Sequence, residues 1–62
     1  MFQVSFRKYV LSGIAEGLDF IEKMRFVDWE DACDWAGSVT LSTKVPFVIL
    51  QMWGPNGEYE EF

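Results

Sequence analysis

The sequence contains no histidine and only one cysteine, Cys33. Without histidine, the Ser-His-Asp and Cys-His arrangements of nucleophilic catalysis are excluded. Zinc sites built from the usual nitrogen and sulfur ligands are excluded as well. The acidic residues between positions 28 and 34 are spread around an exposed helix surface and are not gathered in a cleft, so paired-carboxylate catalysis is not expected. We therefore expect no enzyme activity, no cofactor and no metal.

A single cysteine also cannot form a disulfide within the chain, which suits the reducing cytoplasm. Cys33 is expected to be a small core residue. Long apolar runs are missing, and the longest, residues 45–50, is far too short to span a bilayer. Arg7 and Lys8 interrupt the apolar residues at the N-terminus, so no signal peptide is expected. These features predict a cytoplasmic protein.

Basic residues are scarce: five lysines and arginines stand against ten aspartates and glutamates, for a formal net charge of −5. Nucleic-acid backbones are bound by clustered lysine and arginine, so direct binding of DNA or RNA is not expected. Nucleic-acid bases could stack on basic and aromatic side chains of one sheet face, but the sequence lacks the glycine-aromatic motif of sheet-based RNA-binding modules. The acidity suits docking on a basic protein surface, and it also keeps a small apolar domain soluble.

Apolar side chains are abundant: half of the 62 residues are hydrophobic and 18% are aromatic. A chain of this length forms one domain, here residues 1–62, and buries only about 60% of the surface of its unfolded chain. One helix on one small sheet cannot easily cover eleven aromatic side chains. We therefore expect apolar surface to be left for a second copy of the chain or for a partner.

One segment, residues 28–37, has the pattern of a helix. Asp28 is the expected N-cap, and negative charge in the first turn is favourable there. An apolar stripe at helical spacing is formed by Trp29, Ala32, Cys33 and Ala36. Trp35 lies at the flank of this stripe and is expected to be half-buried. Gly37 is the expected end of the helix, although the helix could extend by a further turn.

Two segments, residues 2–11 and 18–27, alternate between apolar and polar side chains as strands do. Pairing Val4 with Phe26 puts their apolar rows on one face and sets Lys8 opposite Glu22. A third strand, residues 45–53, is apolar on both faces until its last residues. A turn at residues 54–57 would return residues 58–62 either as a short charged edge strand or as a frayed tail.

The element order is therefore β-β-α-β, with a fourth strand if residues 58–62 pair. A right-handed crossover through the helix gives an α+β fold, with an antiparallel sheet of order 2-1-3-4 and the helix packed on one face. The opposite face would show polar residues of the first two strands and one side of the third. That side is either Phe47, Ile49, Gln51 and Trp53, or Val48, Leu50 and Met52. Either choice leaves large apolar groups uncovered.

A tiny, acidic, cysteine-poor β-β-α-β chain with a tryptophan-bearing acidic helix resembles the small proteins that phages use against their hosts. These include the phage inhibitor of bacterial RNA polymerase, which has this strand and helix order, and the anti-CRISPR proteins. The likeness covers the arrangement of residues 2–53 and no residue motif. It implies a phage-encoded, stoichiometric inhibitor in the host bacterial cytoplasm that occludes the basic, nucleic-acid-binding groove of a host defence or transcription complex.

For such an inhibitor we predict a partner-binding surface of acidic and aromatic residues. The acidic residues, which could imitate the phosphates of DNA, are Glu30, Asp31, Asp34, Glu58, Glu60 and Glu61. The aromatic anchors are Trp35, Trp53 and Tyr59. The alternative function is a small structural or oligomerisation module, a homodimer whose open sheet face is its own partner.

Overall fold

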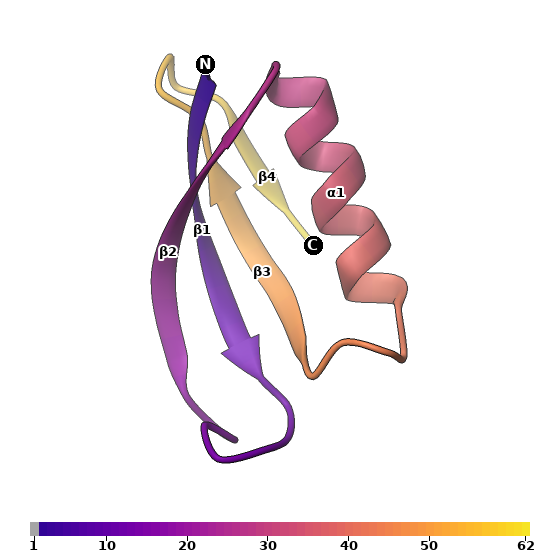
Figure 1. Cartoon of the computed structure of the whole chain (residues 1–62). Helices are drawn as coiled ribbons and strands as arrows, with labels where there is room; N and C mark the ends of the chain where they lie inside the picture. The colour runs from indigo at the N-terminus through magenta and orange to yellow at the C-terminus, as the bar shows by residue number, and fades with distance from the viewer. Residues whose placement is uncertain (1) are drawn as a thin grey trace.

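The computed structural model describes residues 2–62 as a four-stranded sheet with one helix on one face (Figure 1). The elements in chain order are β1 (Phe2–Val10), β2 (Asp19–Phe26), α1 (Trp29–Leu41), β3 (Phe47–Trp53) and β4 (Tyr59–Glu61). The strand order is β2-β1-β3-β4, and all neighbours are antiparallel. The predicted fold class and strand order are confirmed, and the chain after the last turn forms a strand instead of a frayed tail.

The core lies between α1 and the sheet, where two alanines let the helix come close. Ala32 and Ala36 are fully buried against a set of buried sheet residues: Val4, Phe6, Ile49 and Met52. Trp35 closes the flank, with its ring 5.1 Å from that of Phe6 and 5.5 Å from that of Phe26. Trp35 is half-buried as the sequence predicts, and aromatic pairs of this kind add about 0.5–1.5 kcal/mol beyond burial.

The start of α1 agrees with the sequence, and its end corresponds to the longer of the two alternatives. Asp28 is the N-cap, and its carboxylate accepts a hydrogen bond from the N–H of Asp31 at 2.9 Å. The helix does not stop at Gly37 and runs on to Leu41. A glycine inside a helix costs about 0.5–1 kcal/mol relative to alanine. That cost is offset here because the last turn is fixed to the sheet by hydrogen bonds between Thr40 and the backbone of β3.

The register of β1 and β2 differs from the predicted one by two residues. Val4 lies opposite Met24 instead of Phe26, and Lys8 lies opposite Phe20. Side chains alternate with a period of two, so each one keeps its predicted face. The predicted pair of Lys8 with Glu22 still forms, on the diagonal, with 3.0 Å between the Lys8 Nζ and the Glu22 Oε1.

A bulge in β3 decides which of its side chains meet the helix. Arg7 of β1 lies opposite Gln51, but the next residue, Lys8, lies opposite Ile49, so Leu50 is an extra residue. Ile49 is buried under α1, as Met52 is further along the strand. The side chains that share the open face with β1 residues are Val48, Gln51 and Trp53. Both alternatives predicted for β3 are therefore wrong, because the strand changes face at the bulge.

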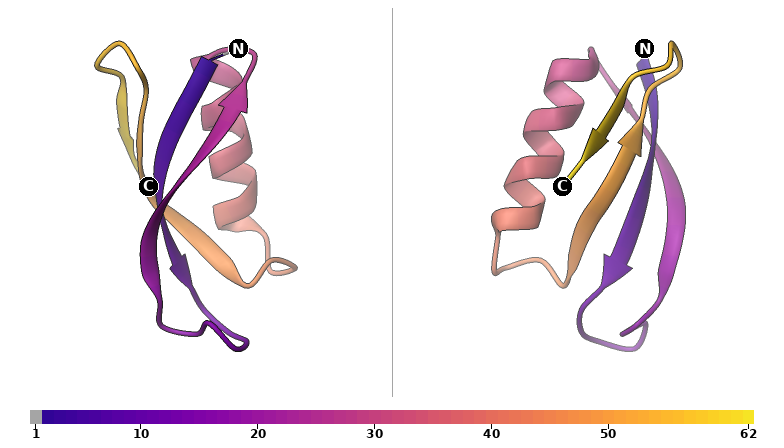
Figure 2. Two further views of the ribbon diagram at one scale, coloured as in Figure 1. Left: turned by 60° about the vertical axis from the view of Figure 1, so that its left-hand side comes forward. Right: turned by 180° about the vertical axis from the view of Figure 1, so that it is seen from behind.

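The helix covers only part of its face of the sheet. The loop end of the β1–β2 hairpin extends beyond the end of α1 (Figures 1 and 2). In this uncovered part, the Lys8 Nζ lies 3.9 Å from the centre of the Phe47 ring and 5.7 Å from that of Phe20. Phe20 remains 37% exposed. Lys8 thus covers apolar rings that the helix does not reach, while its ammonium group stays paired with Glu22.

Candidate protein-binding surface

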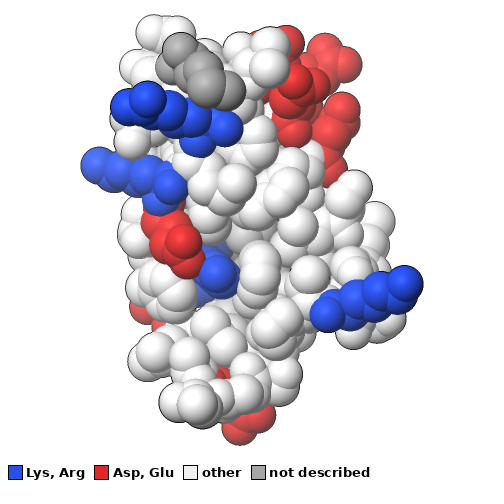
Figure 3. Space-filling model, in the orientation of Figure 1, with Lys and Arg blue, Asp and Glu red and all other residues white. Residues whose placement is uncertain are grey.

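Acidic and basic side chains lie on different parts of the molecule. Four of the five basic residues belong to the β1–β2 hairpin: Arg7, Lys8, Lys23 and Arg25. The N-cap, α1 and the β3–β4 hairpin carry acidic residues and no basic one: Asp28, Glu30, Asp31, Asp34, Glu58, Glu60 and Glu61. In Figure 3 acidic groups gather over the start of α1, and basic groups lie over the hairpin strands on the left.

The structure divides the predicted acidic residues between two faces. Glu30, Asp31 and Asp34 lie on the exposed side of α1. Glu60 lies opposite the buried Met52, so its side chain is on the helix side of β4. We call these four residues, Glu30, Asp31, Asp34 and Glu60, the acidic surface. The only ion pairs among residues 2–62 are Arg7–Asp19 and Lys8–Glu22, so the acidic surface has no counter-ion within the described chain.

The helix residues of the acidic surface and Glu60 of β4 lie close enough to act on one group, the thiol of Cys33. Burial raises its pKa, and the negative charges of Glu60, Asp34 and Glu30 raise it further. A strand residue and two helix residues therefore act on the same thiol. A thiol with a raised pKa is held in its neutral form, which is a poor nucleophile and a poor metal ligand. Cys33 accordingly packs against the core as the sequence predicts.

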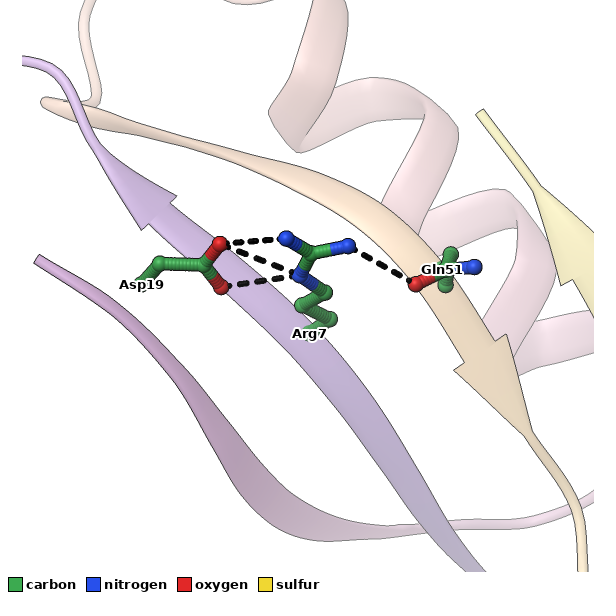
Figure 4. A network of polar contacts seen from close by, with 3 residues as sticks. All are labelled: Arg7, Asp19 and Gln51. Carbon is green, nitrogen blue, oxygen red and sulfur yellow. Dashed lines mark hydrogen bonds and ion pairs between the residues drawn. The ribbon is translucent and has the colours of Figure 1, made fainter.

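A row of hydrogen-bonded polar side chains crosses the open face of the sheet. Arg7 donates from Nε to Asp19 at 2.9 Å and from Nη1 to Gln51 at 3.2 Å (Figure 4). The Gln51 amide donates to the Tyr59 hydroxyl at 2.9 Å, and this hydroxyl donates to Glu61 at 3.1 Å. The row joins all four strands. The hydrogen bonds between Arg7 and Asp19 lower the pKa of the Asp19 carboxyl and raise the pKa of the Arg7 guanidinium.

This polar row makes the open face less apolar than the sequence suggests. Gln51 lies on the open face beside Arg7, as one of the two predicted alternatives for β3 had it. Ile21 is 53% exposed there, and Tyr9 is 37% exposed. Trp53 is half-buried and packs against Tyr59, with 6.0 Å between ring centres. The large apolar area on which the predicted open-face dimer depended is therefore interrupted by polar groups.

The nine residues predicted to bind a partner do not form one patch. Trp35 is occupied in the core, on Phe6 and Phe26. The open face carries Trp53, Tyr59 and Glu61. Glu58 lies in the turn, where its carboxylate accepts a hydrogen bond from the N–H of Asn56 at 2.8 Å. Only the four residues of the acidic surface lie together and have exposed carboxylates free of ion pairs.

Sequence reasoning missed the polar row on the open face. The sequence places polar residues of the first two strands on that face, but the hydrogen bonds of Arg7 with Asp19 and Gln51 were not predicted. A signal was present: Gln51 is the only polar residue in β3. A glutamine inside an apolar strand needs hydrogen-bond partners on its face, and the strand beside it carries an arginine.

The open face also has a shallow hollow of about 190 Å³. It is lined by Gln3, Ser5, Lys23, Trp53, Gly54 and Pro55. Pockets for small molecules usually measure about 300–1,000 Å³, and no acid–base pair lines this one. Among residues 2–62, no group of three potential ligands is placed to hold a metal ion. None of the helices in this part of the chain is long and apolar enough to cross a membrane.

Comparison with known proteins gives no relative: no family model, no curated protein and no solved structure matches this chain.

Proposed function

We propose that the protein is a non-catalytic inhibitor that binds a partner protein through its acidic surface. The observation that supports this function is the grouping of Glu30, Asp31, Asp34 and Glu60 on the side of the molecule away from most of its cations. Unpaired surface charges of one sign raise the rate and the specificity of binding to a surface of the opposite sign. The partner surface is therefore basic.

Helix formation alone does not account for all of these charges. The helix dipole favours Glu30 and Asp31 in the first turn. Asp34 lies beyond that turn, one helical turn after Glu30, and like charges at this spacing cost about 0.2–0.5 kcal/mol. Glu60 adds a fourth negative charge from another element. The fold therefore carries a repulsion that a basic partner would relieve.

A groove that normally holds nucleic acid is the basic surface that this arrangement fits best. Carboxylates one turn apart along a rigid helix present regularly spaced negative charge, as a phosphate backbone does. Together with the resemblance to small phage inhibitors, this spacing supports a phage-encoded protein that occludes the nucleic-acid groove of a host defence or transcription complex. Such an inhibitor acts by occupying the groove and needs no catalytic group.

The test compares two double variants with the same loss of charge. Asp34→Asn with Glu60→Gln removes two charges from the acidic surface and leaves the N-terminal turn of α1 unchanged. Glu16→Gln with Glu61→Gln removes two charges elsewhere. Proteins captured from a bacterial lysate by the wild type are identified by mass spectrometry. The affinity of each variant for a captured protein, and the displacement of labelled nucleic acid from it, are then measured at low and high salt.

We expect the first double variant to bind more weakly and to displace less nucleic acid, with the loss concentrated in the association rate. The second double variant should behave as the wild type does. Binding of the wild type should weaken as salt is added, because screening shortens the range of exposed charges. Equal binding by the two double variants, or binding without displacement of nucleic acid, would contradict the proposal.

A further inference from the structure

The outer edge of β2 is a row of unpaired backbone groups. Val10 donates its N–H to the carbonyl of Leu18 at 2.9 Å. Hydrogen-bonded pairs alternate along an antiparallel ladder, so the even-numbered residues of β2 turn their backbone groups toward β1. The residues between them turn their N–H and C=O groups away from the sheet. They are Asp19, Ile21, Lys23 and Arg25.

The two edges of the sheet differ in how they are protected. β4 has three residues, two of them glutamates, and a short acidic edge discourages pairing. β2 has eight residues with no glycine, proline or bulge. Its first two charged residues, Asp19 and Glu22, are acidic and its last two, Lys23 and Arg25, are basic, so an antiparallel copy brings opposite charges together. The helix lies beside β3 and meets β2 only near the last residues of that strand, so it leaves most of the outer edge of β2 uncovered (Figures 1 and 2).

We propose that β2 pairs antiparallel with β2 of a second copy of the chain, around a two-fold axis at Glu22. The two sheets then join into one sheet of eight strands with both helices on the same face. All four residues with outward backbone groups find a partner: Asp19 pairs with Arg25 of the second copy, and Ile21 pairs with Lys23. Because each such pair exchanges two hydrogen bonds, the edge gains about eight backbone hydrogen bonds.

The side chains are complementary in this register. Asp19, whose carboxylate also holds Arg7 of its own chain, lies opposite Arg25 twice, once on each side of the axis. On the helix side, Phe20 faces Met24 of the second copy, and these side chains are 37% and 38% exposed in the single chain. Edge pairing therefore covers apolar surface that α1 leaves open.

Neighbouring registers are less favourable. A shift of the axis to Lys23 sets two unpaired lysines against each other, which is destabilising. A shift to Ile21 moves Arg25 beyond the end of the partner strand. At the proposed axis Glu22 faces its own copy, but each Glu22 is already paired with Lys8 at 3.0 Å, so two acids and two cations meet there.

This interface is independent of the proposed function, because β2 lies at the other edge of the sheet from β4 and its Glu60. A dimer formed through β2 would carry two acidic surfaces and could bind two partners. Variants of β2 would disrupt the dimer without neutralising the acidic surface, so the two proposals can fail separately.

The first test uses disulfide formation to read the register. In a Cys33→Ser background, Glu22→Cys places two thiols directly opposite each other in a non-hydrogen-bonded pair, where Cα atoms lie about 4.5 Å apart. This distance suits a disulfide. The matched control, Met24→Cys, sets the thiols four residues out of register and about 13 Å apart along the strands. Circular dichroism checks that each variant is folded, and non-reducing gels measure the rate of cross-linking.

We expect Glu22→Cys to cross-link at least tenfold faster than Met24→Cys. Equal rates, or faster cross-linking of the control, would overturn the proposed register. Because Glu22→Cys also removes the partner of Lys8, a second test keeps Glu22 intact. Sedimentation of the wild type should show a dimer, and Arg25→Glu should raise its dissociation constant about tenfold or more by setting acids against Asp19. Lys44→Glu, with the same change in charge away from the edge, should not.

Mixing provides the last check. Asp19→Lys and Arg25→Glu each set like charges against each other in their own dimers, but in the mixed dimer positions 19 and 25 carry opposite charges on both sides of the axis. The mixture should therefore form dimers at concentrations at which each variant alone is monomeric. A monomeric wild type, or a mixture no more dimeric than its components, would overturn the proposal.

Discussion

The hydroxyl of Thr40 lies against the backbone of Ile49 and satisfies both of its polar groups. It accepts a hydrogen bond from the Ile49 N–H at 3.2 Å and donates one to the Ile49 carbonyl at 3.4 Å. Ile49 lies in the part of β3 that β4 does not reach, and it is fully buried. One side chain of the last helical turn thus replaces the missing neighbour strand.

Thr40→Val is expected to destabilise the fold by about 1–3 kcal/mol, because it leaves the buried N–H and C=O of Ile49 without partners. Valine has nearly the shape of threonine, so the loss reports the hydroxyl. Urea unfolding measures the change, and Thr40→Ser, which keeps the hydroxyl, is the control. A Thr40→Val variant as stable as the wild type would show that these two bonds contribute little.

Gly37→Ala is expected to stabilise the protein by about 0.5–1 kcal/mol. Gly37 is inside α1 without a positive φ, and a Cβ built on it has no heavy atom within 4 Å outside the neighbouring helix backbone. Thermal or urea unfolding tests this directly. If Gly37 instead ended the helix in a left-handed conformation, the alanine would destabilise the protein.

Asp19→Asn is expected to lower the free energy of unfolding slightly at neutral pH, because the neutral amide of asparagine replaces the carboxylate that forms an ion pair with Arg7. The Arg7 hydrogen bonds keep the pKa of Asp19 below its ordinary value of 3.8. The stabilisation is therefore present above that ordinary value and is lost as the pH falls through the lowered pKa. Unfolding free energies of the wild type and the variant should converge at acidic pH. The pair is exposed, so the difference at neutral pH is small.

Glu60→Gln is expected to speed the alkylation of Cys33 by iodoacetamide near neutral pH. Glu60 helps to raise the pKa of this thiol, so its neutralisation increases the thiolate fraction. Burial remains the larger cause, so the folded variant should still react more slowly than the unfolded chain. Glu16→Gln is the matched control in the hairpin loop. Equal rates for the two variants would place Glu60 away from the helix.

The element order and the N-cap could be predicted because they depend on local patterns. Alternation along β1 and β2 indicates two strands and their faces, but a shift by two residues leaves the faces unchanged, so the pattern cannot fix the register. The sequence left the end of α1 open between Gly37 and one further turn, because the longer helix depends on hydrogen bonds between Thr40 and Ile49 that only the fold brings together.

The candidate site was predicted only in part for a related reason. The exposure of Glu30 and Asp34 follows from the helix pattern alone. The side on which each β4 residue lies depends on the pairing of β4 with β3, and β3 changes face at Leu50. Glu60 therefore joins the helix acids while Glu61 goes to the opposite face, a division that no local pattern of the C-terminal residues reveals.

The bulge at Leu50 also separates β3 into two halves that can change independently. Before it, Ile49 and Val48 set how the last helical turn rests on the sheet; after it, Gln51 and Met52 set which glutamate of β4 is presented to each side. Without Leu50, Ile49 would still lie opposite Lys8 and Gln51 opposite Arg7, so Glu60 and Glu61 would keep their present neighbours. A single deletion at this position would therefore make the strand regular and leave the charged side of the molecule where it is.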